Sequence, residues 1–545
     1  MRVMNAKILL EFLPADIAEL SPLAHAALSG DLSVPGVRVA RSSAEVKQPA
    51  DRFEPEARAN LSKRLEEAVS SVSPPVAVLD SLRALARPGT CAVVTGQQPG
   101  LACGPLYSVW KGLQAIALAK KLSKEWGTPV VPMFWNHADD HDIAEVHHTW
   151  LLNRNVDIQK AGLAGLSSGR QPFSKILLEE ERHKPAAFAA LLRNVYGDYP
   201  HVDEAVEVFA PRAGETLARA FTRGMTGLLG RHGLVVFEPE WIREDLSSGL
   251  SRIIGGDVPA ALAEGEARLK DAGHAVALPS AEAALVYRIK EDGRHALRAG
   301  GEGYRYDGEA GSRTAAELAA EITQEPAAFS AGALLRPLAQ DIALPVCAYV
   351  GGWGELGYHS QLGALREAAG LTETAFVPRL SVTLSDDETR ASLSALGCSV
   401  ADIITARGGW SSAPNDDARP PVLDTLHALA RSSRDSLLEH RAAISEIDRS
   451  LAAGLKRAAD NLRVTVEKVA LKAERAHSNR SGKGRRHERR ANHALFPREG
   501  VQERSFGPAP FVAKYGFDWL GLLLEELDPF ALEHIHCGLS EDAAG

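Results

Sequence analysis

Residues Cys91–His148 read CAVVTGQQPGLACGPLYSVWKGLQAIALAKKLSKEWGTPVVPMFWNHADDHDIAEVHH, and two kinds of pattern alternate along them. The apolar runs Cys91–Val94 and Val130–Trp135 are each followed by polar residues, as buried parallel strands are. Between these runs, apolar residues recur at helical spacing from Leu106 to Leu122. A strand, a helix and a second strand in this order predict a βαβ unit. Because open α/β sheets bind their ligands at the carboxyl ends of the strands, we expect the active site at that edge.

The length and composition predict a multi-domain protein of the cytoplasm. A chain of 545 residues exceeds what one hydrophobic core normally supports, so two or three domains are expected. The net charge of −9 argues against a nucleic-acid or membrane surface. Five cysteines without a CxxC pair suit a reducing compartment. We expect neither a secretory signal nor a membrane span, because no long apolar run is present.

Further apolar runs extend the predicted sheet. Gly233–Phe237 and Ile342–Val350 have the pattern of buried strands, and the second of them ends in a pair of glycines. Residues 1–90 are predicted to be mostly helical, and the glycine-rich mixture over residues 247–330 indicates an insertion. Together these features predict an α/β fold with a parallel sheet.

A heptad pattern follows a linker at residues 404–422. Apolar residues recur every seven positions in two phases, first Leu423, Ala430, Leu437, Ile444 and Leu451, then Leu455, Leu462 and Val469. Such a repeat with charges between its members predicts a coiled-coil hairpin that reverses near Asp448–Ser450. We interpret the hairpin as an arm for oligomerisation. The alternative is a pair of helices packed on their own domain.

The densest group of titratable residues follows the second strand and consists of Asp139, Asp140, His141, Asp142 and Glu145. Carboxylates beside a histidine orient its ring and raise its basicity, which suits general acid–base catalysis. We therefore predict His141, Asp140, Asp142 and Glu145 to be catalytic. The same residue types could hold a divalent metal, although the sequence offers no second helix with matching ligands. Alternatively, Asp139 and Asp142 cap the following helix.

The loop after the first strand, Gly96–Gly100, matches neither the Walker nor the GxGxxG pattern. It precedes a helix, whose free backbone N–H groups favour an anion. Gly96, Gln97, Gln98 and Gly104 are therefore candidates for holding substrate or phosphate. The alternative is that the glycines serve the geometry of the loop only.

A third group follows the strand at residues 342–350. It offers close backbone approach, a carboxylate and a phenol through Gly351, Gly352, Glu355 and Tyr358. Arg336 precedes the same strand and could bind a substrate carboxylate through two N–H groups. Equally, Arg336 could form a structural ion pair with Asp341.

Taken together, these motifs resemble one protein family. The motifs are TGQQPGL and GPLY, VPMFW leading into DDHDIAEVHH, RPLAQDIALPVCAYVGGWGELGYHSQL, and LFPREGVQERSF at Leu495–Phe506. In this order, from Cys91 to about Tyr515, they resemble the bacillithiol biosynthesis cysteine-adding enzymes, the BshC family. One departure lies at residues 138–142, where Ala-Asp-Asp-His-Asp stands in place of the family's Gly-Glu-Asp-His-Asp. The charge is kept and the reach of one carboxylate is shortened.

The resemblance implies a Rossmann-like parallel-sheet core with two inserted connecting segments and an α-helical coiled-coil arm for dimerisation. We accordingly assign the core to residues 1–159, to a strand at 233–246 and to residues 331–402. Between these parts lie the helical connecting segment 1 at 160–232 and connecting segment 2 at 247–330. The arm follows at 403–491, and a C-terminal segment at 492–545 returns to the core.

The implied activity is the joining of L-cysteine to glucosaminyl-malate, the last step in making bacillithiol. The implied partners are these two small molecules and a second copy of the chain, with no nucleic acid and no membrane. ATP or ADP could serve as cofactor, and no metal is expected. The family is also associated with ADP bound near the junction of arm and core, and we assign Gln502 and Arg504 to that nucleotide.

In this hypothesis His141, supported by Asp140 or Asp142, takes the proton from the sugar amine, and Arg336 binds the malate carboxylates. The other predicted substrate-binding residues are Gly96, Gln97, Gln98, Gly104, Tyr107, Gly351, Gly352, Glu355 and Tyr358. An adenylate mechanism rests on analogy of fold, because neither a HIGH nor a KMSKS signature is present. Two alternatives come from other classes: a nucleotide-binding scaffold or regulatory protein without catalysis, and a metal-dependent hydrolase.

Overall fold

The computed structural model describes residues 2–12, 20–33, 36–49, 53–153, 155–167, 169–300, 303–307, 311–411, 421–479 and 483–543. The chain divides into two compact units. The first comprises Met1–Asp387 and Pro497–Gly545, and the second comprises Glu388–Phe496. The second unit is therefore inserted in the sequence of the first.

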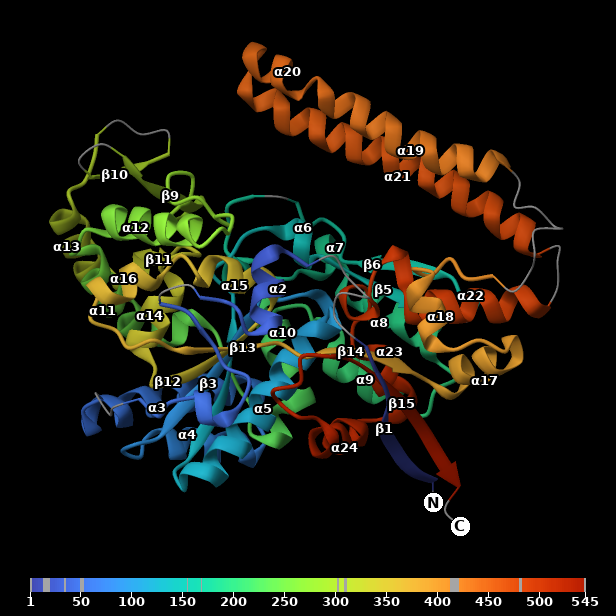
Figure 1. The fold of residues 1–545 in the computed structure, drawn as a ribbon, viewed down its shortest axis with the longest axis horizontal. Helices are drawn as coiled ribbons and strands as arrows, with labels where there is room; N and C mark the ends of the chain where they lie inside the picture. Colours follow the sequence, from blue (N-terminus) through green and yellow to red (C-terminus); the bar gives the residue numbers. More distant parts are fainter. Residues whose placement is uncertain are drawn as a thin grey trace. The chain divides into compact units, whose positions relative to one another are not determined.

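A six-stranded parallel sheet forms the centre of the first unit (Figure 1). Its strands lie in the order β2 (Arg38–Val39), β13 (Ala375–Pro378), β12 (Val346–Gly351), β3 (Cys91–Gln97), β4 (Val130–Asn136) and β7 (Val235–Phe237). From β3 the chain adds β4 and β7 on one side, and it then returns to add β12 and β13 on the other. The strand order therefore reverses between β3 and β12, the position at which α/β sheets hold their ligands. The predicted α/β fold is confirmed.

Helices cover both faces of this sheet, because successive strand residues point to opposite faces. Val93 packs with residues of α5 (Leu106–Trp126), whereas Val94 packs with residues of α3 (Pro55–Val69) and α4 (Val76–Leu85). Helix α5 ends at Gly127, whose φ of +64° is the left-handed conformation that favours glycine. Strand β12 begins at Val346 rather than at the expected Ile342, because Arg336–Ala343 form helix α14.

Two segments are inserted between strands of the sheet. Between β4 and β7 lie α6 (Ile143–Val146), the hairpin of β5 (His148–Leu152) and β6 (Ile158–Gly162), α7 (Glu180–His183), α8 (Pro185–Tyr196), α9 (Val202–Phe209) and α10 (Leu217–Leu229). Between β7 and β12 lie α11 (Arg243–Ile254), α12 (Val258–Asp271), the sheet of β10 (Gly303–Tyr306), β9 (Gly293–Gly300), β8 (Val286–Lys290) and β11 (Phe329–Ala331), α13 (Ala315–Gln324) and α14. Within this second segment, helix α11 packs against both α13 and α14.

The two ends of the chain pair with each other in a second sheet. Strand β1 (Arg2–Phe12) runs antiparallel to β15 (His534–Ala543), which runs parallel to β14 (Ser381–Ser385). The ends of the chain accordingly lie side by side in Figure 1. The expectation that residues 1–90 are mostly helical is wrong for β1. Its partner is at the opposite end of the chain, where no local pattern reveals it.

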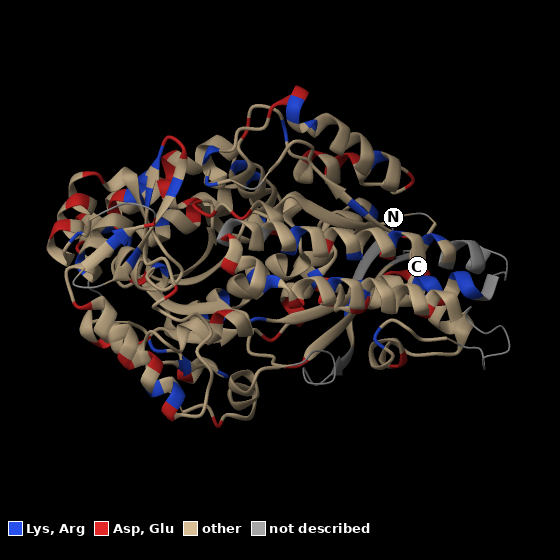
Figure 2. Cartoon of the chain, turned by 90° about the horizontal axis from the view of Figure 1, so that it is seen from above, with Lys and Arg blue, Asp and Glu red and all other residues tan. Residues whose placement is uncertain are grey.

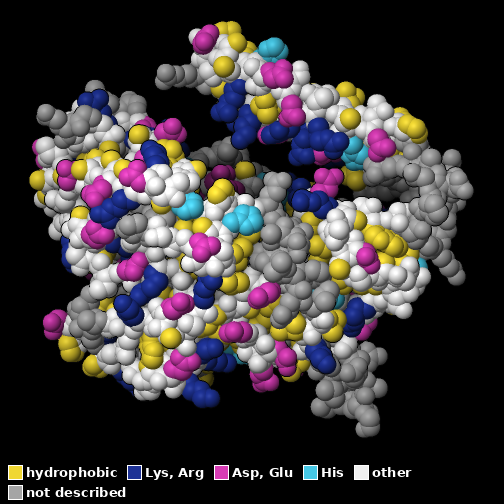
Figure 3. Space-filling view, in the orientation of Figure 1, with side chains coloured by type: hydrophobic (Ala, Val, Ile, Leu, Met, Phe, Trp, Pro, Cys, Tyr) yellow, Lys and Arg dark blue, Asp and Glu magenta, His cyan; other side chains and the backbone are white. Residues whose placement is uncertain are grey.

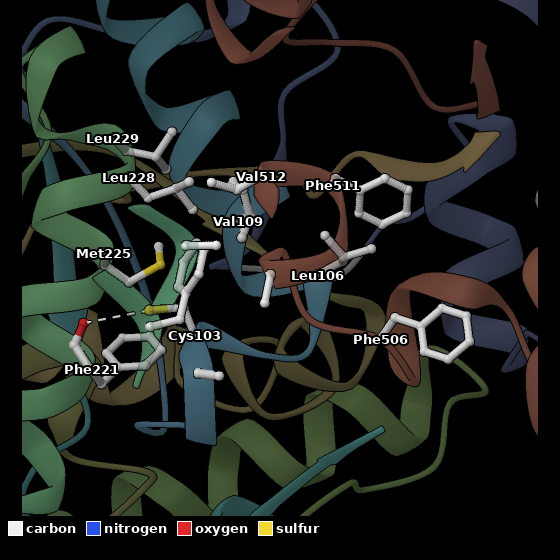
Figure 4. Packing of buried hydrophobic residues seen from close by; sticks show 14 of the residues in the cluster. Cys103, Leu106, Val109, Phe221, Met225, Leu228, Leu229, Phe506, Phe511 and Val512 are labelled. Carbon is white, nitrogen blue, oxygen red and sulfur yellow. Dashed lines mark hydrogen bonds between the residues drawn. The ribbon is translucent and has the colours of Figure 1, made fainter. Parts of the chain in front are cut away.

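The C-terminal helices α23 (Ala509–Tyr515) and α24 (Asp518–Glu526) pack on the core. Figure 4 shows Phe511 and Val512 of α23 in one cluster with Leu106 of α5 and Met225 of α10. Deeper in the first unit, the ring of Trp110 meets that of Trp519 edge-on, with 6.1 Å between their centroids. Residues after Pro497 therefore complete the core built by residues before Asp387.

The second unit contains the predicted hairpin. Its helices are α17 (Asp387–Leu396), α18 (Val400–Thr405), α19 (Pro421–Glu439), α20 (Arg441–Ile447), α21 (Arg449–Asn479) and α22 (Lys483–Leu495). Helices α19 and α21 lie along each other, and Arg434 binds Asp460 across them with an N–O distance of 2.9 Å (Figure 1). The chain reverses at Asp448, between α20 and α21. The coiled-coil arm is thus confirmed.

The buried seam of the arm differs in part from the heptad prediction. Leu423 and Ala430 are buried as expected, but Leu462 and Val469 are 40% and 53% exposed. Alanines take the inner positions of α21 instead, namely Ala452, Ala459 and Ala470. Small residues let two helices approach closely, so the larger side chains are left facing outward.

The second unit also begins earlier than the expected residue 403. Helix α18 packs against α22, and Glu388 forms an ion pair with Arg490 at 2.7 Å. Trp410 exchanges two backbone hydrogen bonds with the side chain of Asn492. These contacts join residues 388–411 to the helices of the arm.

Acidic and basic residues are interspersed along the chain (Figure 2). None of the helices in the described ranges is both long and apolar enough to cross a bilayer.

Candidate active site

A pocket of about 370 Å³ lies at the carboxyl edge of the parallel sheet. The ends of three strands and the second inserted segment line it. Its polar and aromatic lining comprises Gln97, Gln98, Trp135, His137, Asp139, Asp140, Arg243, Ser247, Tyr287, Arg294, Phe329, Ser330, Arg336, Glu355 and Tyr358. Of the residues predicted from the sequence, the pocket brings together Gln97, Gln98, Asp140, Arg336, Glu355 and Tyr358.

Glu355 is fully engaged by protein donors. Its carboxylate accepts hydrogen bonds from Lys111 Nζ at 2.5 Å, from the Tyr349 hydroxyl at 2.7 Å and from the Gly352 backbone N–H at 2.8 Å. Burial alone would raise the pKa of Glu355, but Lys111 and these hydrogen bonds lower it below the ordinary value. Glu355 is thus an ionised support for the rim of the pocket, and the predicted substrate-binding residue Gly352 donates its N–H to this support.

Arg336 offers the pocket a cation. Its guanidinium donates to the Tyr358 hydroxyl at 3.1 Å and to Gln340 Oε1 at 3.2 Å, and it lies 5.7 Å from the ring centroid of Trp135. Among the residues that the structure describes, no carboxylate is within ion-pair distance of Arg336. The alternative pairing with Asp341 is wrong, because Asp341 binds Arg366. A buried guanidinium without a carboxylate suits an anionic ligand.

A second arginine of the pocket is neutralised by the protein. Arg243 of α11 binds Asp139 through both of its terminal nitrogens, one of them 2.7 Å from the carboxylate oxygen. Burial would raise the pKa of Asp139, but the charge and hydrogen bonds of Arg243 lower it. The suggestion that Asp139 caps the following helix is therefore wrong. Asp139 instead joins the end of β4 to the second inserted segment.

Arg294 reaches the pocket from strand β9. Its guanidinium stacks over the ring of Tyr287, 3.7 Å from the centroid, and lies 3.6 Å from Asp140. Arg294 also donates to Ser330 Oγ at 3.3 Å. Its Nε is buried and has no hydrogen-bond partner among the described residues. The pocket therefore holds a second guanidinium that its neighbours satisfy only in part.

His141 is held by Arg294. Its Nδ1 accepts a hydrogen bond from Arg294 Nη1 at 3.2 Å, and its ring lies edge-on to Tyr287 with 6.0 Å between centroids. Burial and the charge of Arg294 lower the pKa of His141, outweighing Asp140 and Asp142, which raise it. The expectation that neighbouring carboxylates make this histidine more basic is therefore wrong.

The remaining acids of the cluster have separate contacts. Asp142 caps helix α6, as its side chain accepts from the Ala144 N–H at 3.1 Å, so the capping alternative is confirmed there. Asp140 accepts from Gln98 Nε2 at 2.7 Å. Burial raises the pKa of Glu145, which also hydrogen-bonds Gln98. The cluster therefore divides between a helix cap and the rim of the pocket.

The buried Lys111 of helix α5 stabilises the end of β3 and the loop that follows it. Lys111 Nζ donates to the Gly96 carbonyl at 2.9 Å and to Gln97 Oε1 at 3.1 Å. Gln97 Nε2 in turn lies 3.4 Å from the hydroxyl of Tyr107, whose pKa is raised by burial. These bonds orient Gln97 at the pocket edge, while Asp140 orients Gln98.

Other predicted residues of the rim lie in packed surroundings. A Cβ placed on Gly104 would lie 3.3 Å from the Cα of Gly507, so Gly104 faces the C-terminal segment. A Cβ placed on Gly351 would lie 2.6 Å from the ring of Phe376. Both glycines therefore serve close packing.

Comparisons with known proteins address the identity of the chain. Residues 38–380 match the model for the N-terminal Rossmann-like domain of bacillithiol biosynthesis BshC, and residues 382–538 match the model for its C-terminal coiled-coil domain. The chain belongs to the BshC family. The resemblance seen in the sequence is thereby confirmed.

Three relatives of this BshC-family chain are each named "Putative cysteine ligase BshC". That of Koribacter versatilis is 31% identical over 445 residues, which are 81% of this chain and 82% of the relative. That of Solibacter usitatus is 30% identical over 496 residues, or 88% and 90% of the two chains. That of Geobacillus kaustophilus is 28% identical over 471 residues, or 83% and 85%.

The two residues assigned to a nucleotide differ in their surroundings. Gln502 is buried, and its amide exchanges two hydrogen bonds of 2.8 Å with the backbone of Leu384 in β14. Arg504 is exposed, and its positive charge partly offsets the rise in the pKa of Tyr107 that burial causes. The side chain of Gln502 thus serves the sheet, which leaves Arg504 as the candidate for contact with a nucleotide.

The described residues contain no group of three or more His, Cys, Asp or Glu side chains placed to hold a metal ion. The cysteines are all free thiols. Cys103 is buried and donates to the Phe221 carbonyl at 3.8 Å (Figure 4), and burial raises its pKa. A thiol that holds its proton this firmly is a poor nucleophile.

Several pocket residues were missed by the sequence reasoning. Tyr287 and Arg294 come from residues 247–330, which were interpreted as an insertion, and Arg243 comes from residues 233–246, which were assigned to a core strand. No local sequence pattern singles out any of the three. His137 carried a usable signal, because it comes two residues after the predicted strand Val130–Trp135, at the carboxyl edge of the sheet.

Proposed function

We propose that this chain is a ligase that forms the amide bond between the carboxyl group of L-cysteine and the amine of glucosaminyl-malate, the last step of bacillithiol biosynthesis. Membership of the BshC family and the printed name of its relatives support this proposal. The observation that carries it is the guanidinium of Arg336 in the pocket, which has no carboxylate partner among the described residues.

The chemistry of the pocket suits the malate end of this substrate. Malate brings two carboxylates, and the pocket offers Arg336 and the partly satisfied Arg294. A guanidinium presents two parallel N–H groups to a carboxylate, and such charge-assisted pairs are about twice as strong as neutral hydrogen bonds. Because Arg243 is already neutralised by Asp139, it adds no free charge. We therefore assign the malate carboxylates to Arg336 and Arg294.

The proposed reaction also requires an activated cysteine. Amide formation from a free carboxylate and an amine is uphill in water, so we propose that ATP activates the cysteine carboxyl group. Gln97 and Gln98 border the pocket at the end of β3, next to the start of α5. We propose that this loop holds cysteine or its activated form, while Arg504 contacts a nucleotide.

We propose that the arm joins two copies of the chain in the cytoplasm. Helices α19 and α21 expose Leu429, Leu451, Leu462 and Val469, whose side chains are 40–53% accessible. Figure 3 shows apolar side chains beside Lys and Arg on this part of the chain. A second arm would cover these apolar side chains by coiled-coil packing.

The direct test is a ligation assay. Purified protein is incubated with L-cysteine, glucosaminyl-malate and ATP, and the cysteinyl product is measured by mass spectrometry. Product is expected only when all three are present. A glucosamine conjugate without the malate carboxylates should react poorly, because Arg336 and Arg294 lose their ligand. No product with the complete mixture would contradict the proposal and favour a protein that binds nucleotide without catalysis.

A further inference from the structure

His137 is a ring that the protein leaves partly unsatisfied. It follows strand β4, and its backbone N–H donates to the Gln97 carbonyl at 2.9 Å, which fixes the residue beside the end of β3. The imidazole lines the pocket. Its Nε2 is buried and has no hydrogen-bond partner among the described residues. Buried polar atoms nearly always have a partner, so this one indicates a group that the pocket receives.

Gly96 makes room for this ring. A Cβ at Gly96 would lie 2.9 Å from His137 Nε2 and 2.7 Å from the carbonyl oxygen of Trp135. Neither distance is compatible with an undisturbed side chain, so any larger residue would displace the imidazole or the strand. The glycine that the sequence suggested as a backbone contact for substrate therefore admits a histidine to the pocket wall.

Burial and the charges around the ring keep it neutral. Burial is the largest reason that the pKa of His137 lies well below its ordinary value, and Arg336 of α14 and Lys111 of α5 lower it further. The carboxylates of the pocket are bound elsewhere, Glu355 by Lys111, Asp139 by Arg243, and Asp140 by Gln98. A neutral imidazole carries a free lone pair, which is what a general base requires.

We propose that His137 is a catalytic residue, whose imidazole takes the proton from the amine of the amino-sugar substrate as that amine attacks the activated cysteine carboxyl group. The inference rests on the proposed ligase function and adds the residue that moves the proton. His141 was the candidate from the sequence, but its Nδ1 is engaged by Arg294. His137 lies in the pocket wall itself.

The amine nitrogen forms a bond to the carbonyl carbon of cysteine, and the bond from that carbon to the phosphate oxygen of a leaving group, supplied by a nucleoside triphosphate, breaks. The nitrogen loses one proton to His137, and the resulting imidazolium later releases it to water. Substrate carboxylates bound to Arg336 would cancel the positive charge that opposes protonation of His137. Binding of the correct substrate therefore makes the ring a stronger base.

The first test removes the ring and supplies it again in solution. His137→Ala should lower kcat by about 100-fold or more, with the KM for glucosaminyl-malate changed by less than about threefold. Added imidazole should restore part of the rate in proportion to its concentration. Added 1,2,4-triazole, a ring of the same size but far weaker basicity, should not. A ring with a merely structural role would be replaced equally well by both compounds.

Two further variants make the result decisive. His137→Gln keeps most of the volume of the side chain and should show the same loss of kcat at an unchanged Tm, which covers the case that His137→Ala does not fold. The matched control is His232→Ala in η5 (Gly230–His232), outside the pocket, where Nε2 is likewise buried and has no partner among the described residues. It should keep full activity and gain nothing from imidazole.

The possible outcomes distinguish the role of His137 from the proposed ligase function. If the unaltered protein makes product and His137→Gln keeps its rate, or if triazole rescues His137→Ala as well as imidazole does, the role of His137 is wrong and the ligase function stands. If the unaltered protein makes no product, both the role of His137 and the ligase function are wrong.

Discussion

Arg336 donates a hydrogen bond of 3.1 Å to the hydroxyl of Tyr358, and both side chains line the same pocket. This bond orients a guanidinium whose remaining N–H groups can meet a ligand. Arg336→Lys replaces the planar fork by a single ammonium group, so we expect the KM for glucosaminyl-malate to rise by about 10- to 100-fold. Steady-state kinetics at saturating cysteine and ATP measure this.

Tyr358→Phe is the control for that prediction. It removes the acceptor but leaves the charge of Arg336 in place, so its effect on KM should be about tenfold at most, the value of one hydrogen bond. A KM that is the same for Arg336→Lys and the unaltered protein would exclude Arg336 from substrate binding.

The ion pair between Asp139 and Arg243 predicts a pH-dependent stability. Asp139→Asn leaves a buried guanidinium unpaired, so the free energy of unfolding at pH 7 should fall by about 3–5 kcal/mol. Arg243 lowers the pKa of the Asp139 carboxyl in the folded state. The stabilisation is therefore present above pH 3.8, the ordinary pKa of the carboxyl group, and is lost as the pH falls through the lower folded value.

Urea unfolding at several pH values from 7 to 3 tests this, with Asp245→Asn as the comparison. Asp245 binds Arg64 at 2.6 Å, but both side chains are about a third exposed. Its loss should cost about 1 kcal/mol or less. A deficit of Asp139→Asn that stays constant down to pH 3 would contradict the ionised pair.

Local patterns were sufficient for the centre of the fold. The apolar runs Cys91–Val94 and Val130–Trp135 are local signals, and these residues do form neighbouring parallel strands with α5 between them in the sequence. Strand β1 was missed because its partner β15 lies at the opposite end of the chain. The seam of the arm was misassigned because alanine, with its short side chain, gives a weak heptad signal.

The site could be predicted only where polar side chains follow the end of a predicted strand. Gln97, Gln98 and Glu355 follow predicted strands, and the reversal of strand order brings them to one pocket. The partners of the acidic cluster could not be found in this way. No local sequence pattern singles out Arg243 or Arg294. Arg243 nevertheless neutralises Asp139, and burial together with the charge of Arg294 makes His141 less basic.

Gly96 and Gly354 form a matched pair of glycines at the carboxyl edge of the sheet. Gly96→Ala places a Cβ 2.7 Å from a backbone oxygen, so we expect a loss of about 1–3 kcal/mol in stability and a displaced His137. Gly354 lies in helix α15 (Trp353–His359), where nothing lies within 4 Å of an added Cβ. Gly354→Ala should be neutral or stabilise the protein by up to about 1 kcal/mol. Thermal unfolding of the two variants, alongside the ligation rate, checks the contrast, and equal Tm values would oppose it.

His141 is expected to act through Arg294 and not on the reacting atoms. His141→Gln changes the acceptor that Arg294 uses, so the KM for glucosaminyl-malate should rise by about tenfold, corresponding to one hydrogen bond. The value of kcat should stay within about threefold, because the proton acceptor is elsewhere. A loss of kcat as large as that of His137→Gln, without a change in KM, would return the catalytic role to His141.

The exposed apolar side chains of α21 predict how the arm assembles. Leu462 is 40% exposed and Val469 is 53% exposed. Burying a leucine contributes about 1.5–3 kcal/mol, so Leu462→Lys should raise the dimer dissociation constant by at least about tenfold. Analytical ultracentrifugation over a range of concentrations measures this. Lys468→Ala, on another side of the same helix, should leave the association unchanged, which separates burial of the apolar stripe from any general effect of altering α21. A chain that sediments as a monomer at every concentration before any substitution would show that the apolar stripe has another purpose.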